Sequence, residues 1–253
     1  MTPSSPGNVA VGPFEVLDAT RAEVVDAIVD AAVAGPTEAV HVYALHVGGL
    51  NARQDQSFVE AMRGADLVYA DGGSVVWLAK RGGARTIERA PTTDIGWDVL
   101  RVLAGRRGRP VRMALIGGPP GLAERAGAEM EASGWAQLVF ATHGFHDDWA
   151  DPLRQARGAA PEITVVGLGA PREMVWAQAH HEDLPAGILL TCGGWFGHIV
   201  GDEKRAPTMI RRSGLEWIAR LAQSPRRLAP RYARGLVSTG AILIEARRGS
   251  PKS

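Results

Sequence analysis

One carboxylate stands where an α/β protein would place a catalytic group. Asp71 directly follows the apolar run 67–70, which predicts a strand, and two glycines come after it. Ligands of open parallel sheets bind beyond the carboxyl ends of the strands, so the side chain of Asp71 is expected to project into a ligand cleft. A carboxylate there can take a proton from a hydroxyl nucleophile. The alternative is an N-cap for a helix that begins near Ser74, an ordinary role for aspartate.

Glycines also follow the other apolar runs of the chain. They stand in Gly72-Gly73, Gly117-Gly118-Pro119-Pro120-Gly121, Gly144, Gly167-Leu168-Gly169-Ala170-Pro171 and Gly193-Gly194. Glycine lets backbone N–H groups approach a phosphate closely, and the helix N-termini that follow favour negative charge. Any single turn of this kind can need glycine for its geometry alone. Five together favour a phosphate-bearing ligand.

The common nucleotide-binding signatures are incomplete. Arg172 stands where the pattern G-x-G-x-x-G would need its third glycine, which disfavours a dinucleotide-dependent dehydrogenase. The pattern G-x-x-x-x-G-K-[ST] does not occur, which disfavours a P-loop kinase or ATPase.

A charged segment near residue 90 is a further candidate for ligand binding. Arg89 could clamp a diphosphate through two parallel hydrogen bonds, and Asp94 could cap a helix over residues 97–103. For the pair Glu88-Arg89 the alternative is a surface ion pair, which is the commoner outcome.

The sequence gives little support for a metal site. The segments 143–148 and 180–183 are rich in His, Asp and Glu but lack an established ligand spacing, so we interpret them as solvated surface clusters. No Asp-x-Asp triplet occurs, and we expect no metal or other cofactor. Cys192 lies in no motif of a reactive thiol and is interpreted as a buried structural residue.

Alternating apolar strands and helical patterns predict the elements that position these residues. Strands are expected at 14–17, 39–46, 67–70, 111–116, 137–142, 163–167 and 188–191, and helices at 21–33, 53–63, 73–81, 93–105, 120–133 and 171–181. This order favours an α/β fold, a Rossmann-like parallel sheet flanked by helices. We predict a flexible N-terminus over 1–12, the core over 13–195, and a basic helical C-terminal appendage over 196–253, broken by Pro207, Pro225 and Pro230.

The net charge of +1 conceals an uneven distribution. Residues 201–253 carry twelve basic and four acidic side chains, a net charge of +8, which leaves −7 on the rest. Such a tail suits a polyanionic partner. A single cysteine fits a reducing compartment, and no apolar run reaches the ~18–20 residues that span a bilayer. The N-terminus also lacks the layout of a secretory signal, so a cytoplasmic location is expected.

In their order along the chain, several motifs resemble the WecG/TagA/CpsF glycosyltransferases, glycosyltransferase family 26. The resemblance runs from roughly residue 12 to 235 with nearly collinear spacing. The matching segments are 55–58, 65–72, Glu88-Arg89, Asp94, 117–121, Gly144-Phe145, 166–171 with Trp176, 205–207, 214–217 with Arg220, 225–227 and Arg231-Tyr232. No single motif is specific, but their ordered sum is.

The resemblance implies an inverting, metal-independent transferase that moves an N-acetylmannosamine-type sugar or related hexose from a UDP-sugar to a polyprenyl-pyrophosphate-linked acceptor. By the same resemblance Asp71 is the general base, and the nucleotide-sugar site includes Gly72, Arg89, Asp94, Gly117, Gly118, Gly144, Phe145, Gly169, Pro171 and Glu173. Arg220, Arg227 and Arg231 of the tail would hold the acceptor or the diphosphate. The resemblance further implies a role in cell-surface polysaccharide or teichoic acid synthesis, and peripheral attachment to the inner face of the membrane.

The chain departs from the family pattern at three places. Where the family reads Pro-Lys-Gln-Glu the chain has Glu173 in place of Gln and Met174 in place of Glu, and Thr92 occupies a glycine position. The family's Thr-x-Asn falls on Tyr43-Ala44-Leu45, although Asn51 could substitute if the loop is shifted. These changes keep a second acceptor class open, a soluble natural product. A nucleic-acid-binding protein without transferase activity is disfavoured because few aromatic residues accompany the basic tail. Self-association is left open.

Overall fold

The protein, in a computed structural model, is described over residues 7–202 and 225–249. Its centre is a parallel sheet of six strands in the order β4-β3-β8-β7-β5-β6. The strands are β3 (Ala39–Leu45), β4 (Leu67–Ala70), β5 (Val111–Gly117), β6 (Ala136–Thr142), β7 (Ile163–Gly167) and β8 (Gly187–Thr191). Every residue of β7 is buried, as expected for a parallel strand covered on both faces. The predicted fold class is confirmed.

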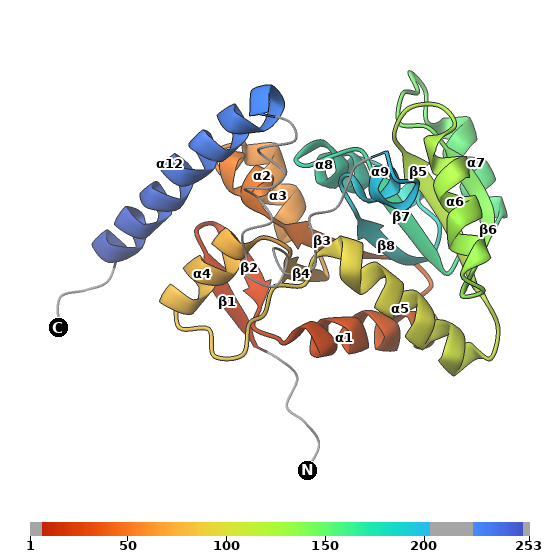
Figure 1. The fold of residues 1–253 in the computed structure, drawn as a ribbon, viewed down its shortest axis with the longest axis horizontal. Coiled ribbons are helices and arrows are strands. Elements are labelled where there is room, and N and C mark those ends of the chain that lie inside the picture. Colours follow the sequence, from red (N-terminus) through yellow and green to blue (C-terminus); the bar gives the residue numbers. More distant parts are fainter. Residues whose placement is uncertain (1–6, 203–224, 250–253) are drawn as a thin grey trace, which may run out of the picture.

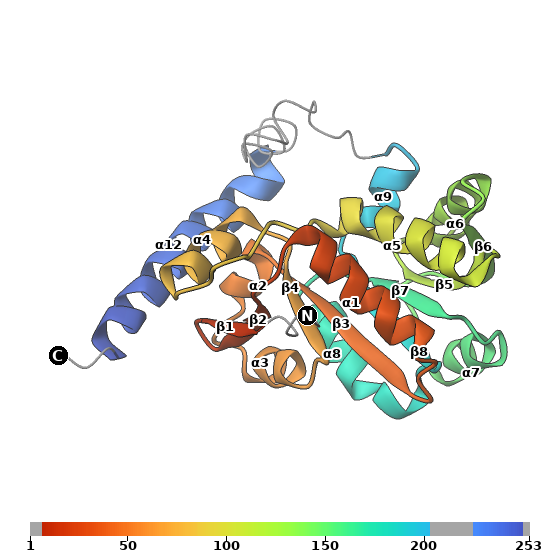
Figure 2. The ribbon, with the colours of Figure 1, turned by 90° about the horizontal axis from the view of Figure 1, so that it is seen from below.

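Helices cover both faces of the sheet (Figures 1 and 2). One face packs against α1 (Arg21–Val33), α5 (Thr92–Arg107), α6 (Leu122–Ala132) and α9 (Trp195–Ile199). The other face packs against α3 (Gln56–Arg63), α4 (Gly73–Arg81), α7 (Ala150–Gly158) and α8 (Arg172–Ala179), with α2 (Val47–Asn51) and the short turn η1 (His181–Asp183) beside them. Because all six strands are parallel, their carboxyl ends lie along one edge, where the loops that begin at His46, Asp71, Gly118, His143, Leu168 and Cys192 gather.

A hairpin occupies part of the segment predicted to be flexible. Strand β1 (Asn8–Val11) pairs antiparallel with β2 (Phe14–Leu17), so the prediction of a flexible 1–12 is wrong for residues 8–11. Gly12 has a φ of +62°, and Gly12-Pro13 forms a two-residue turn between Val11 and Phe14. Glycine is favoured at the first position of a two-residue hairpin turn because it adopts a positive φ, so Gly12 is a hairpin signal that the sequence contains.

The predicted boundary between core and appendage falls inside α9. Trp195 and Phe196 are both buried against α5 and α6, so the core extends beyond residue 195. Gly96 of α5 leaves room for the Trp195 ring, since a Cβ on Gly96 would stand 2.1 Å from Trp195 Cη2.

The last element is one long helix, α12 (Pro225–Gly249). Pro225 is its first residue, where proline is tolerated, but Pro230 lies inside the helix and does not break it as predicted. One face of α12 packs on the core: Ile242 covers Gly12, and Ser238 Oγ accepts from Arg53 Nη1 at 3.0 Å and donates to Asn51 Oδ1 at 3.2 Å. The helix therefore lies against α2 and α4, at the β4 end of the sheet (Figure 1).

Candidate functional site

Asp71 follows the last residue of β4 and is held there by backbone hydrogen bonds. Its N–H donates to the Leu45 carbonyl at 3.0 Å, and the Gly72 N–H donates to the same oxygen at 3.3 Å. The N-cap of α4 is Gly72, without a side-chain capping bond. The capping interpretation of Asp71 is therefore wrong. Its half-buried carboxyl group stands at the edge where the carboxyl ends of the strands meet.

Arg89 lies beside Asp71. The guanidinium Nε donates to the Asp71 carbonyl at 3.0 Å, and Ala90 N donates to the Ala70 carbonyl at 2.8 Å. The loop before Arg89 is held by Asp18, whose carboxylate accepts from the backbone N–H groups of Arg85, Thr86 and Ile87 at 2.7–2.8 Å. Asp18, a positioning residue that the sequence analysis missed, therefore fixes the loop that presents Arg89.

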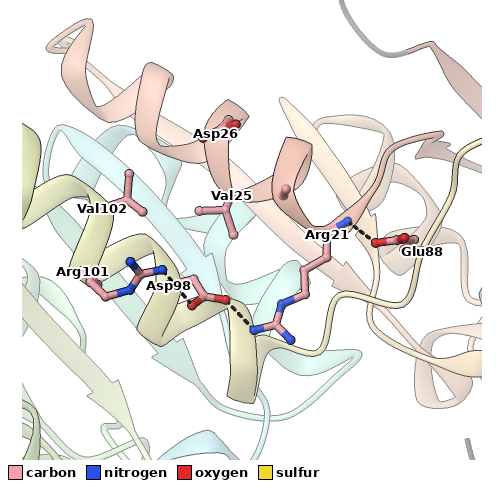
Figure 3. A pocket seen from close by; sticks show the side chains of 8 residues that line it. Arg21, Val25, Asp26, Glu88, Asp98, Arg101 and Val102 are labelled. Atoms are coloured by element: carbon pink, nitrogen blue, oxygen red, sulfur yellow. Dashed lines mark hydrogen bonds and ion pairs between the residues drawn. The ribbon is translucent and has the colours of Figure 1, made fainter. Parts of the chain in front are cut away.

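Arg21 is a second residue that the sequence analysis missed. Its guanidinium pairs with Asp98 and lies 3.8 Å from Asp94, and the backbone N–H of Arg21 donates to Glu88 Oε2 at 3.0 Å. Arg21, Glu88 and Asp98 border an open hollow of about 370 Å³ between α1 and α5 (Figure 3). Asp94 lies in the first turn of α5, which begins at Thr92 rather than near Trp97, so the predicted capping role is wrong. The hollow is lined by residues of α1 and α5 and the Glu88 loop, not by the strand ends.

The glycine turns of β5, β6 and β7 pack against one another. Gly118 N donates to the Gly167 carbonyl at 3.1 Å, and Gly144 N donates to the Gly118 carbonyl at 2.9 Å. At Gly117, with φ +141°, a Cβ would stand 2.4 Å from the Gly167 oxygen, so no larger residue fits. The N–H groups of Gly118 and Gly144 thus donate to backbone carbonyls of neighbouring turns, and the predicted approach to a phosphate stays a prediction. Arg172 Nη2 closes the cluster by donating to the Gly144 carbonyl at 2.8 Å.

Phe145 projects from this cluster. Its side chain is 65% exposed, an unusual state for phenylalanine next to a buried glycine. Exposed aromatic faces at strand ends can stack on a planar ring of a ligand.

Glu173 is buried at the start of α8. Its Oε2 accepts from Gly169 N at 2.9 Å and from Gly193 N at 3.2 Å, so one carboxylate joins the turns that follow β7 and β8. The pKa of Glu173 is raised to about 7, mainly by burial and to a lesser degree by the charge of Asp71, against the lowering effect of the backbone hydrogen bonds. Pro171, the N-cap of α8, follows a cis peptide bond.

The site residues divide into two groups along the edge. Asp71, Gly72 and Arg89 lie at β4, whereas Gly117, Gly118, Gly144 and Phe145 lie at β5 and β6. Four strand spacings separate β4 from β5, a distance of about 19 Å. The β7 and β8 turns that Glu173 joins lie between the two groups. The arrangement suits an extended ligand whose two ends bind at different strands.

The interpretation of the histidine segments as solvated clusters holds for their exposed Asp and Glu side chains but not for the histidines, which are half-buried and make specific contacts. His146 is bonded to Thr142 Oγ1 at 2.7 Å and stacks on His143. His181 Nδ1 lies 3.0 Å from Nε2 of buried His41, whose Nδ1 lies 2.5 Å from the Tyr43 hydroxyl. Tyr43, at the family's threonine position, therefore directs its hydroxyl to His41. Within the described part of the chain no three His, Cys, Asp or Glu side chains gather as metal ligands would.

The remaining predictions concern Cys192 and the arginines of the tail. Cys192 is buried, as predicted, and burial raises the pKa of its thiol. Of the predicted tail arginines, Arg220 lies outside the described residues, and Arg227 and Arg231 lie on the α12 backbone without described side chains. None of the helices described here combines the length and apolarity that crossing a membrane requires.

Fold and site together define an α/β protein in which Asp71, Arg89 and several glycine turns gather along the carboxyl edge of a parallel sheet. The sequence matches the family described as "Glycosyl transferase WecG/TagA/CpsF family" over residues 9–253. The chain therefore belongs to the WecG/TagA/CpsF glycosyltransferases, and it is a glycosyltransferase that uses a nucleotide-sugar donor and an acceptor. The resemblance found in the sequence is confirmed.

Proposed function

We propose that the protein is an inverting glycosyltransferase that moves an N-acetylmannosamine-type sugar or related hexose from a UDP-sugar to a hydroxyl of a polyprenyl-pyrophosphate-linked acceptor. The observation that carries this proposal is the position of Asp71, a carboxylate at a strand end that does not cap a helix, beside Arg89. The family membership supports the transfer itself.

In the proposed reaction Asp71 takes the proton of the acceptor hydroxyl. The hydroxyl oxygen then forms a bond to the anomeric carbon of the donor, while the bond from that carbon to the diphosphate oxygen breaks and the nucleoside diphosphate leaves with the electron pair. Attack from the face opposite the leaving group inverts the anomeric centre.

The leaving diphosphate carries the charge that develops in the transition state. Arg89 lies at the Asp71 end of the site, and the basic tail adds Arg220, Arg227 and Arg231, whose charges we propose stabilise the leaving diphosphate. With these cations, no metal is needed to stabilise the leaving group. Gly72 and Asp94 lie at the same end, and the N-terminus of α4 begins at Gly73.

The nucleotide would lie toward β5 and β6. The turns of Gly117, Gly118 and Gly144 lie at this end of the site, Phe145 offers an exposed ring, and the turn of Gly169 and Pro171 leads into α8. The sugar then points toward β4 and Asp71. Glu173 would contribute to this site by holding the turns that follow β7 and β8 in position.

We also propose that the protein meets its lipid-linked acceptor as a peripheral protein on the inner face of the membrane. The exposed apolar residues of α12 support this proposal, because an acceptor carried on a polyprenyl chain is confined to a membrane surface.

The decisive experiment compares Asp71→Asn with the wild-type protein. Release of nucleoside diphosphate is followed for UDP-, GDP- and TDP-sugars with a polyprenyl-pyrophosphate-linked sugar or a soluble hydroxyl acceptor. We expect turnover with a UDP-sugar and the lipid-linked acceptor, and a loss of about 10²-fold or more in kcat for Asp71→Asn, because the general base is removed.

The exposed Asp151→Asn in α7 is the matched control and should retain wild-type turnover. Near-wild-type turnover of Asp71→Asn would refute the role of Asp71. Turnover with soluble acceptors alone would replace the lipid-linked acceptor by a natural-product acceptor.

A further inference from the structure

Two buried hydroxyl groups lie in a line behind Asp71. Tyr69 and Thr92 are both almost fully buried, and the Tyr69 hydroxyl oxygen lies 2.6 Å from Thr92 Oγ1. Thr92 Oγ1 in turn lies 3.5 Å from Asp71 Oδ2. Tyr69 and Asp71 are two residues apart at the end of β4, so their side chains lie on the same face of the sheet.

The chemistry of the three groups sets the direction of these hydrogen bonds. An ionised carboxylate only accepts, so the Thr92 hydroxyl must donate to Asp71 Oδ2. The oxygen of Thr92 then accepts from Tyr69, whose hydroxyl proton is directed to Thr92. Burial, and to a lesser degree the charge of Asp71, raises the pKa of Tyr69 well above its usual value, so its hydroxyl stays a donor at neutral pH.

Thr92 is held in place independently of Asp71. It is the first residue of α5, and the chain two residues earlier is tied to β4 by the bond from Ala90 N to the Ala70 carbonyl at 2.8 Å. A bond of 3.5 Å is long, but hydrogen bonds at catalytic groups commonly tighten when substrate binds. The hydroxyl therefore faces the carboxylate from a fixed position.

We propose that Thr92, oriented by Tyr69, is a positioning residue for Asp71: its hydroxyl fixes the orientation of the carboxylate and stabilises its ionised form. The inference rests on the proposed function in one respect, the role of Asp71 as the base. Thr92 stands where the family pattern described above has glycine, so this hydrogen bond would be a feature of this chain.

Other titratable groups face the same region and must be kept constant in a test. Glu173 of α8 couples electrostatically to Asp71, Cys192 lies near Tyr69, and Arg89 donates to the Asp71 carbonyl. Substitutions at Thr92 and Tyr69 leave all three in place. A change in the titration of Asp71 therefore measures the effect of the Thr92 and Tyr69 hydroxyl groups.

The first test needs no substrate. Full-length protein labelled with ¹³C at aspartate Cγ is titrated by NMR, and Asp71→Asn identifies the resonance of Asp71. Thr92→Val should raise the pKa of Asp71 by about one unit, because a hydrogen bond to the ionised form is lost. Thr92→Ser should restore the wild-type titration, and Tyr69→Phe should raise the pKa by less than Thr92→Val. Thermal unfolding checks that each variant folds.

The second test uses turnover. Thr92→Val should lower kcat about tenfold, move the acid limb of the kcat/KM profile to higher pH, and leave KM for the donor unchanged, with Thr92→Ser close to wild type. A folded Thr92→Val with a wild-type titration curve overturns the inference. Full turnover of Asp71→Asn overturns the proposed function instead, while the NMR result still stands or falls on its own.

Discussion

Glu173 is an ionisable residue in a buried position, where ionisation of its carboxyl group costs free energy. The side chain is almost completely buried, yet its oxygen must accept from the N–H groups of Gly169 and Gly193 to join two turns of the site. Either an ionised or a neutral carboxyl can accept these bonds. The residue therefore keeps the turns together at a free-energy cost that depends on pH.

The sign of this cost follows from the raised pKa of Glu173, about 7 in the folded protein against a usual 4.5. Between these two values the folded state binds more protons than the unfolded state, so stability falls as pH rises from about 4.5 to 7. Glu173→Gln keeps an accepting oxygen and has no charge to bury. It should raise the free energy of unfolding above pH 7, by about 3 kcal/mol at most, and change it little at pH 4.5.

Urea unfolding of both proteins at pH 5 and pH 8 measures the difference. Glu182→Gln, an exposed glutamate of η1, is the control and should show no such dependence on pH. Equal effects of Glu173→Gln at both pH values would contradict a raised pKa.

At the residue scale, the sequence predicted those groups whose role depends on local position. Asp71 and the glycines are recognisable because each directly follows an apolar run that forms a strand. Arg21 and Asp18 were missed because their partners lie about 70 residues away, Asp98 and the 85–87 loop respectively. For the same reason, no local sequence pattern predicts the contact between His41 and His181, which are 140 residues apart.

At the scale of elements, two glycines of α5 separate the effects of helix propensity and packing. Both occur within the same helix, but a Cβ on Gly96 would stand 2.1 Å from Trp195, whereas a Cβ on Gly105 would meet nothing within 4 Å. Gly105→Ala should stabilise the protein by up to about 1 kcal/mol. Gly96→Ala should destabilise it by roughly 1–3 kcal/mol, because the Trp195 ring must move.

Thermal unfolding of the two variants measures the contrast, and each serves as the other's control. A Gly96→Ala protein as stable as Gly105→Ala would show that α9 does not pack on α5 through Trp195. The outcome bears on the site, since Trp195 directly follows the Gly193-Gly194 turn that Glu173 holds.

Among the elements, those with their own apolar pattern were predictable, and those that depend on tertiary contacts were not. The predicted strand at 67–70 and helix at 73–81 agree with the structure residue for residue. Strand β1 has only two buried apolar residues, Val9 and Val11, and it packs against α4, which comes much later in the sequence. Pro230 was expected to end a helix on local grounds, yet α12 continues through it.

At the scale of the whole molecule, α12 fixes where the end of the basic C-terminal segment lies. Its buried residues Gly235, Ser238 and Ile242 share one face and hold the helix against the core near β4. The helix therefore places the end of the basic segment at the side of the sheet that carries Asp71 (Figure 1). A basic segment there is positioned to serve both a diphosphate and an anionic surface.

The opposite face of α12 carries apolar side chains in contact with solvent. Leu236, Val237 and Ile244 are 77%, 73% and 52% exposed, and they lie within an arc of about 100° around the helix. Transfer of each side chain to the boundary of a lipid bilayer would lower the free energy of the protein. Each nearby Lys or Arg adds about 1 kcal/mol of binding free energy at an anionic surface. Together these contributions support the proposed reversible attachment.

The proposed attachment predicts that the triple variant Leu236→Ser, Val237→Ser and Ile244→Ser folds normally but binds vesicles poorly. In sedimentation with vesicles of phosphatidylglycerol and phosphatidylcholine, its apparent affinity should fall at least tenfold, because the apolar contribution is lost while the charge is unchanged. Val33→Ser, an exposed apolar residue at the end of α1, is the control and should bind as the wild type does. If the triple variant binds as tightly as Val33→Ser, the apolar face of α12 does not contact the lipid. Attachment would then depend on charge alone, and high salt would abolish it.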